Sequence, residues 1–251
     1  MKPEQEYTLV EHLTELRKRL IIVAVTFIIS LAIGFSIAPE ILTFIKMQPT
    51  AQHVEWNVFG YTDGLMIYLK CALLLAILIT LPIALYQTWL FVKPGMSGDE
   101  SKGTIMFIPA SFLLFLAGIS FSYFLLFPLM LNFMSTINES IGAVETYGMK
   151  QYFTFMFNLI IPVGIVFELP LVILFLTKLG IATPTKLRKM RKIAYFILVI
   201  VGVSISPPDF ISDVLIIIPL LLLFEVSILV SSWSLKRKQA NEVRREKILK
   251  E

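Results

Sequence analysis

The sequence has few charged residues, one cysteine and two histidines, and each shortage excludes a class of protein. Only 16% of its 251 residues are charged and 57% are hydrophobic, whereas soluble domains carry about 25% charged residues. Such a chain cannot cover its surface with polar groups, which argues against a soluble enzyme, and its apolar excess excludes intrinsic disorder. Because Cys71 is the only cysteine, an internal disulfide and a cysteine-based metal site are excluded, and we expect Cys71 to act as a small hydrophobic residue.

Signals for catalysis are also missing. Both histidines, His12 and His53, lie outside the hydrophobic runs, and no Ser/His or Asp/Asp pair stands out as an active site. The sequence contains no Gly-Lys-Ser/Thr loop of the kind that binds nucleotide phosphates. We therefore predict no catalytic residue, no metal site and no cofactor.

Long hydrophobic runs dominate the chain. A membrane helix needs about 20 apolar residues to cross about 30 Å of hydrocarbon. Bilayers admit only helices or closed barrels, and these runs lack the alternation of barrel strands. We predict an all-α, polytopic membrane protein that forms a single integral membrane domain over residues 1–251. The predicted spans are 20–38, 65–92, 105–131, 152–176, 193–206 and 210–233.

The last two spans are predicted to be short and to form a hairpin. Residues 193–206 would extend only about 21 Å at about 1.5 Å per residue. They join the sixth span through a proline-rich turn, 206–209, that cannot continue as helix. Prolines inside the spans predict six kinked helices in a curved, concave bundle, although membrane helices also tolerate proline in general. These prolines are Pro82, Pro109, Pro128, Pro162, Pro170 and Pro219.

The distribution of basic residues predicts the orientation. Nineteen of the 22 Lys and Arg residues fall in the two termini and in the two loops that share a side with them. The positive-inside rule then places both termini in the cytoplasm, in a cell membrane, with residues 234–251 as a basic cytoplasmic tail. The cations anchor the chain to anionic membrane lipid, so we predict no nucleic-acid partner.

Residues 1–19 are predicted to form an amphipathic cytoplasmic helix that runs into the first span. Glu15 and Arg19 are four residues apart on this helix and could form an ion pair. Thr8 and Glu11 have the spacing of a capping box. One face of the helix carries Leu9, Leu13, Leu16 and Leu20.

Two acids inside the spans, Glu168 and Glu225, are costly in a membrane unless they are neutral, hydrated or paired. One interpretation is a functional acid, and the other is a protonated carboxyl that hydrogen-bonds a neighbouring helix. Glu225 lies nearer the inner end and could also reach the headgroups. A proton-coupled transporter of small solutes that uses Glu168 and Glu225 is therefore the alternative function, although no internal repeat typical of such carriers is visible.

Four segments carry recognisable motifs: 12–20 (HLTELRKRL), 85–94 (LYQTWLFVKP), 167–170 (FELP) and 206–209 (SPPD). In this order they resemble the H-L-x-E-L-R-x-R-L, L-Y-Q-x-W-x-F-x-x-P, F-E-x-P and T/S-P-P-D motifs of the TatC family, the core subunit of the twin-arginine protein translocase. Six spans with a cytoplasmic N-terminus also fit this family.

The resemblance implies a membrane receptor and scaffold that binds export signals with two adjacent arginines on folded precursor proteins. It implies recruitment of single-span subunits of the TatA and TatB type, self-association, and transport driven by the proton-motive force. Glu15 and Glu100 would bind the two arginines, with Leu16 and Arg17 as supports.

The remaining implied roles lie in and beyond the membrane. Glu168 would form an intramembrane polar contact with partner subunits. The alternative for Asp99 and Glu100 is that they only interact favourably with the dipole at the start of the helix that follows them. The outer turn would be formed by Pro207, Pro208 and Asp209, and Pro49 would match a proline of the outer cap.

Overall fold

The computed structural model describes residues 9–48, 51, 56–93, 105–144, 146–207 and 209–248. Within these ranges the chain is helical apart from turns and short connections, and no β-strand occurs. The all-α prediction is therefore confirmed. The chain divides into two compact units, Met1–Met47 with Leu65–Phe112, and Gln48–Gly64 with Leu113–Glu251.

Five helical stretches in the described ranges are long and apolar enough to cross a membrane. The fifth predicted span corresponds to a helix of 15 residues, Arg191–Ile205, which is too short to be among them. The count of six spans, their kinks and the curved bundle stay predictions. The five stretches are Leu13–Lys46, Asp63–Val92, Phe107–Ser140, Met149–Lys178 and Phe210–Arg237.

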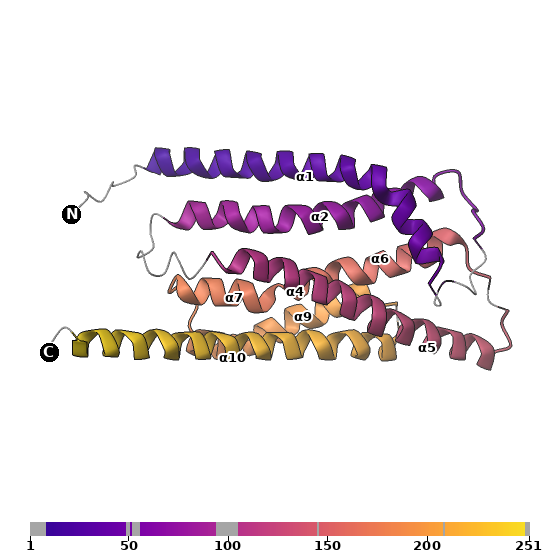
Figure 1. Ribbon diagram of the computed structural model, residues 1–251. Coiled ribbons are helices and arrows are strands. Elements are labelled where there is room, and N and C mark those ends of the chain that lie inside the picture. The colour runs from indigo at the N-terminus through magenta and orange to yellow at the C-terminus, as the bar shows by residue number, and fades with distance from the viewer. Residues whose placement is uncertain are drawn as a thin grey trace. The chain divides into compact units, whose positions relative to one another are not determined.

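The first unit consists mainly of two long helices, α1 (Leu9–Lys46) and α2 (Asp63–Val92), which lie side by side and run in opposite directions (Figure 1). Small residues allow the close approach, as is typical of membrane helices. A Cβ on Gly34 would lie only 2.9 Å from the Ala72 carbonyl oxygen. The buried side chains of these two helices include Ser30, Ala38, Leu42, Ala72 and Ala76.

Helix α1 differs from the prediction at its end. It begins within the predicted amphipathic segment and continues through Pro39 to Lys46 instead of ending at Ala38. A proline removes one backbone hydrogen bond, and in this helix the small and apolar face continues past it, because Ala38 and Leu42 are both buried. Residues 1–8 of the predicted N-terminal helix lie outside the described residues.

The second unit packs helices around an aromatic core. Phe115, Phe127, Phe153 and Phe157 have no more than 1% of their surface exposed. Its helices are α4 (Phe107–Phe121, which begins in the first unit), the π-helical segment Ser122–Leu126, α5 (Phe127–Ser140), α6 (Met149–Val166), α7 (Leu169–Lys178), α8 (Pro184–Lys189), α9 (Arg191–Ile205) and α10 (Phe210–Ile248).

Prolines explain two irregularities that periodicity did not predict. Before Pro128 the chain forms a π-helical turn, in which the Phe127 N–H donates to the Ser122 carbonyl. Pro170 lacks an N–H, and the helix is interrupted at Phe167 and Glu168, so the predicted fourth span is divided into α6 and α7. The Glu168 carbonyl accepts hydrogen bonds from the amides of the two residues after Pro170.

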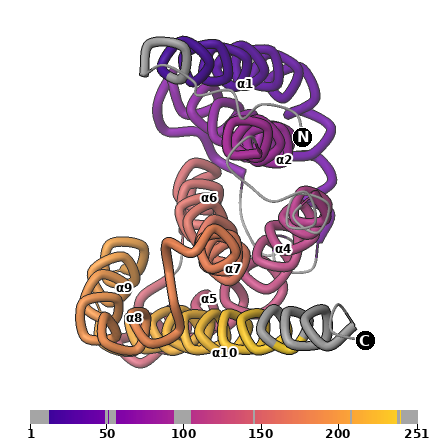
Figure 2. Tube along the Cα trace, turned by 90° about the vertical axis from the view of Figure 1, so that its left-hand side faces the viewer, coloured from indigo at the N-terminus to yellow at the C-terminus, as the bar shows by residue number. Residues whose placement is uncertain are grey.

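Helix α10 is longer than its predicted span and continues to Ile248, so most of the predicted basic tail is helical. Figure 2 views α6 and α7 nearly end-on while α10 runs across the view, so α10 crosses these helices rather than lying parallel to them. At the α7–α10 contact the hydroxyls of Thr177 and Ser231, both buried, lie 2.7 Å apart.

Candidate functional site

Glu15 lies on the helix predicted to bind the signal, and its carboxylate is already held by a guanidinium. Arg19, one turn later on α1, donates from Nη2 to Glu15 Oε1 at 2.7 Å. Arg19 also donates from Nη1 to Gln87 Oε1 on α2 at 3.0 Å. The side chains of Arg19 and Glu15 are 23% and 25% exposed, so solvent screens the pair only in part.

Among the other residues predicted to bind the signal, Leu16 is 44% exposed and Arg17 is also exposed. Glu100 lies outside the described residues, as do Asp99, Pro49 and Pro208. The described structure therefore does not test whether Glu15 and Glu100 lie close together.

Gln87 is the residue of this cluster that the sequence analysis did not assign. Gln87 lies in the LYQTWLFVKP motif, but a sequence motif does not show which side chain of another helix its residues contact. Nearby on the same helix end, the Tyr86 and Trp89 rings stack at 5.9 Å and the Lys93 ammonium lies 4.9 Å from the Trp89 ring centroid. This end of α2 therefore combines aromatic and cationic groups.

Glu168 is buried at the turn between α6 and α7, with 6% of its surface exposed. A tight helix crossing fixes this turn. A Cβ on Gly118 of α4 would lie 2.8 Å from the Phe167 Cβ and 2.9 Å from the Gly164 Cα. The Phe121 and Phe167 rings also contact, at 5.4 Å between centroids, so two residues of α4 pack against the residue before Glu168.

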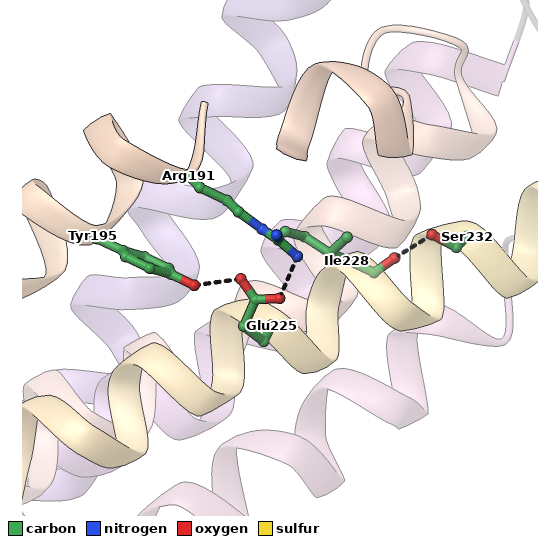
Figure 3. A network of polar contacts seen from close by, with 5 residues as sticks. All are labelled: Arg191, Tyr195, Glu225, Ile228 and Ser232. Carbon is green, nitrogen blue, oxygen red and sulfur yellow. Dashed lines mark hydrogen bonds and ion pairs between the residues drawn. The ribbon is translucent and has the colours of Figure 1, made fainter. Parts of the chain in front are cut away.

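Glu225, the second acid predicted to lie within a span, joins α10 to α9 (Figure 3). Tyr195 donates from its hydroxyl to Glu225 Oε1 at 2.5 Å, and Arg191 donates from Nη2 to Glu225 Oε2 at 2.7 Å. The side chains of Arg191 and Glu225 are 42% and 33% exposed. Glu225 is therefore bonded to the neighbouring helix, although its partners include a cation as well as a hydroxyl.

Two aspartates organise the turn before α10, which the sequence predicts to be an outer turn. Asp209 Oδ1 accepts a hydrogen bond from the Ser212 N–H at 2.7 Å, which is the geometry of a helix N-cap. The Ser206 hydroxyl bonds to the Asp213 carboxylate. Asp209 therefore has a structural role in starting α10 in addition to any role that the motif implies.

A further ion pair, which the sequence analysis did not predict, lies at the start of α6. Lys150 Nζ lies 2.9 Å from Asp63 Oδ1, and the Asp63 side chain is 6% exposed. The Gly60 N–H donates to Asp63 Oδ2 at 2.9 Å, which ties the carboxylate to the preceding turn. An open pocket of about 420 Å³ beside it is lined by Phe59, Gly60, Asp63, Lys150, Gln151 and Thr154.

In the described parts of the chain no three His, Cys, Asp or Glu side chains come together as possible metal ligands. The polar clusters of this structure are ion pairs and hydrogen bonds, several of them between helices. They can bind charged peptide groups or hold helices together.

Comparison with known proteins identifies relatives along most of the chain. A family model described as "Sec-independent protein translocase protein (TatC)" matches residues 11–219. The Sec-independent protein translocase protein TatC of Halalkalibacterium halodurans is 43% identical over 97% of this chain and 96% of its own length. TatCy of Bacillus subtilis is 42% identical over 93% of this chain and 92% of its own length. A crystal structure of a twin-arginine translocase receptor, TatC, superposes with a TM-score of 0.77 at 34% identity, covering 89% of this chain and 99% of that one.

Proposed function

The chain belongs to the TatC family of Sec-independent protein translocase components, and we propose that it is the membrane receptor that binds twin-arginine export signals. As a TatC protein it is a membrane-embedded translocase component and not an enzyme. The proposal concerns the finer steps, which are how the signal is read, which partners are recruited and how the chain is oriented.

The observation that carries the proposal is the contact between Glu15 and a guanidinium. Arg19 Nη2 lies 2.7 Å from Glu15 Oε1, so this carboxylate is placed and partly desolvated in a way that suits an arginine side chain. A guanidinium is planar and presents five donors in a fork, whereas lysine offers a compact point charge. A carboxylate in this setting therefore favours Arg-Arg over Lys-Lys in a signal.

Glu100 is proposed as the second acid, on the resemblance alone. One carboxylate on each of two cytoplasmic segments would read the two adjacent arginines of an extended peptide. Charge-assisted hydrogen bonds of this kind contribute about 1.5–3 kcal/mol each where solvent is partly excluded. Leu16 and Arg17, both exposed beside Glu15, would support the peptide backbone or its apolar side chains.

Glu168 is proposed to contact the single-span partner subunits of the TatA and TatB type. A carboxyl at 6% exposure on a turn between two apolar helices could receive a polar group from a neighbouring membrane helix. The tight crossing of Gly118 and Gly164 would keep that turn in place. Transport itself would draw on the proton-motive force, with both termini in the cytoplasm and the complex in the cell membrane.

The alternative of a proton-coupled solute carrier is not favoured. The relatives are named as protein translocase components, and Glu225 is held by Arg191 and Tyr195. A carrier would transport a small solute as the lone protein in liposomes. A signal receptor would bind a twin-arginine peptide and transport nothing alone.

The test is photo-crosslinking of a twin-arginine signal peptide to the full chain in membranes. Glu15→Gln keeps the size of the side chain and removes its charge, so we expect the crosslink to fall at least ten-fold, as the loss of more than about 1.4 kcal/mol would cause. Glu40→Gln is the matched control, because Glu40 is an exposed acid near the other end of the same helix. Unchanged crosslinking in a Glu15→Gln, Glu100→Gln double variant would refute the receptor site.

A further inference from the structure

We propose that Arg19 is an intramolecular occupant of the signal site, which holds the Glu15 carboxylate before a signal arrives and is displaced when a signal arginine binds. This inference rests on the proposed function, because it describes how the Glu15 site is regulated. Arg19 carries the same guanidinium group as the proposed ligand, and it already makes the contact that the ligand would need, at 2.7 Å. Two guanidinium groups cannot take the same carboxylate oxygen in the same geometry, so the two compete.

Because of Gln87, displacement from Glu15 requires only a short movement of the Arg19 guanidinium, which remains hydrogen-bonded to Gln87. Gln87 is buried, and its Oε1 accepts from Arg19 Nη1 at 3.0 Å, across the α1–α2 seam. When Glu15 changes partner, Arg19 can keep this second hydrogen bond, and the Gln87 carbonyl is not left without a donor. Gln87 is thus a positioning residue, which acts on the signal through Arg19.

Arg19 uses only part of its hydrogen-bonding capacity in this cluster, so another guanidinium can replace it at Glu15. Arg19 Nε is buried and makes no hydrogen bond within the described residues. The guanidinium is therefore held by two side-chain contacts and not by the full set of donors that it could use. A signal arginine that adds contacts of its own can replace it at Glu15.

Competition with an internal guanidinium would also sharpen selectivity. A ligand binds Glu15 only when its contact with this carboxylate is more favourable in free energy than the contact that Arg19 makes. An arginine of the signal matches the geometry of the group that it displaces, whereas a lysine replaces a planar fork with a point charge. The preference for Arg-Arg would then arise partly from the receptor's own Arg19.

The experiment measures the affinity of a fluorescent synthetic twin-arginine signal peptide for the full chain in lipid nanodiscs at fixed salt. Arg19→Gln removes the competitor and keeps a polar group beside Gln87. We expect binding to tighten by about five-fold, or about 1 kcal/mol, the scale of a partly exposed ion pair. Lys18→Gln is the matched control, because it removes the same charge from an exposed neighbour and reports the general electrostatic effect. A Lys-Lys peptide should gain less than the Arg-Arg peptide from Arg19→Gln.

A second measurement does not depend on that variant. In the wild-type chain with ¹⁵N-labelled arginine, the Arg19 Nε resonance, assigned by its loss in Arg19→Lys, should shift when the twin-arginine peptide is added. The inference is overturned if Arg19→Gln binds no more tightly than Lys18→Gln, or if the resonance does not move at saturation. Glu15→Gln separates the two proposals. Wild-type affinity in both Glu15→Gln and the Glu15→Gln, Glu100→Gln double variant would overturn the proposed function itself, whereas loss of binding there without tightening in Arg19→Gln overturns only the inference.

Discussion

The close approach of α1 and α2 gives the sharpest test of the packing, through Gly34→Ala. An added Cβ would lie 2.9 Å from the Ala72 carbonyl oxygen and 3.1 Å from the Ala72 Cα, both of which are backbone atoms that cannot rotate away. Overpacking of this kind costs about 1–3 kcal/mol, and the better helix propensity of alanine returns about 1 kcal/mol. We therefore expect a net loss of about 1 kcal/mol, which corresponds to a fall in Tm of about 2–4 °C.

Cys71 provides the assay for this substitution. It is buried on α2, next in sequence to Ala72, and it is the only cysteine of the sequence. A thiol-reactive dye that fluoresces on labelling will therefore report when the packing around α2 opens as a detergent-solubilised sample is heated. Labelling should begin at a lower temperature in Gly34→Ala than in the wild type.

Gly64→Ala is the matched control, because a Cβ at Gly64 of α2 meets nothing within 4 Å. This substitution should leave Tm unchanged or raise it, since alanine favours helix by up to about 1 kcal/mol over glycine. If Gly34→Ala and Gly64→Ala shift the labelling temperature equally, the close approach at Gly34 does not contribute to stability and the reasoning fails.

Three further outcomes follow from the site geometry. Glu225→Gln should destabilise the fold slightly, by less than about 1 kcal/mol because the pair with Arg191 is partly exposed. A double-mutant cycle of Glu225→Ala, which removes the acceptor oxygens, with Tyr195→Phe measures the coupling, and zero coupling would contradict the hydrogen bond. Asp209→Ala should destabilise the start of α10 by about 1 kcal/mol, while Asp209→Asn retains the cap; equal thermal stability of the two variants would argue against capping. Glu168→Ala should leave crosslinking of the signal peptide largely intact and stop export in cells, and continued export would mean a structural role.

The motifs of this sequence located candidate functional residues but not their contacts. The HLTELRKRL segment identified Glu15 and its possible pairing with Arg19, because residues four apart on a helix are neighbours whatever the rest of the chain does. The bond to Gln87, 68 residues away, depends on how α1 and α2 are rotated toward each other. The same holds for the pairing of Glu225 with Arg191, which periodicity within one helix could not reveal.

The sequence by itself determined that this protein is helical and embedded in a membrane, because hydrophobic length and the need to satisfy every backbone hydrogen bond leave no other solution for such runs. Only the tertiary structure decided that α1 continues through Pro39 and that the chain turns at Glu168. It also decided which cations hold the acids of distant segments, with Lys150 at Asp63 and Arg191 at Glu225. These features depend on which side chains meet when separate segments pack, and a contact between distant segments leaves no periodic trace in either one.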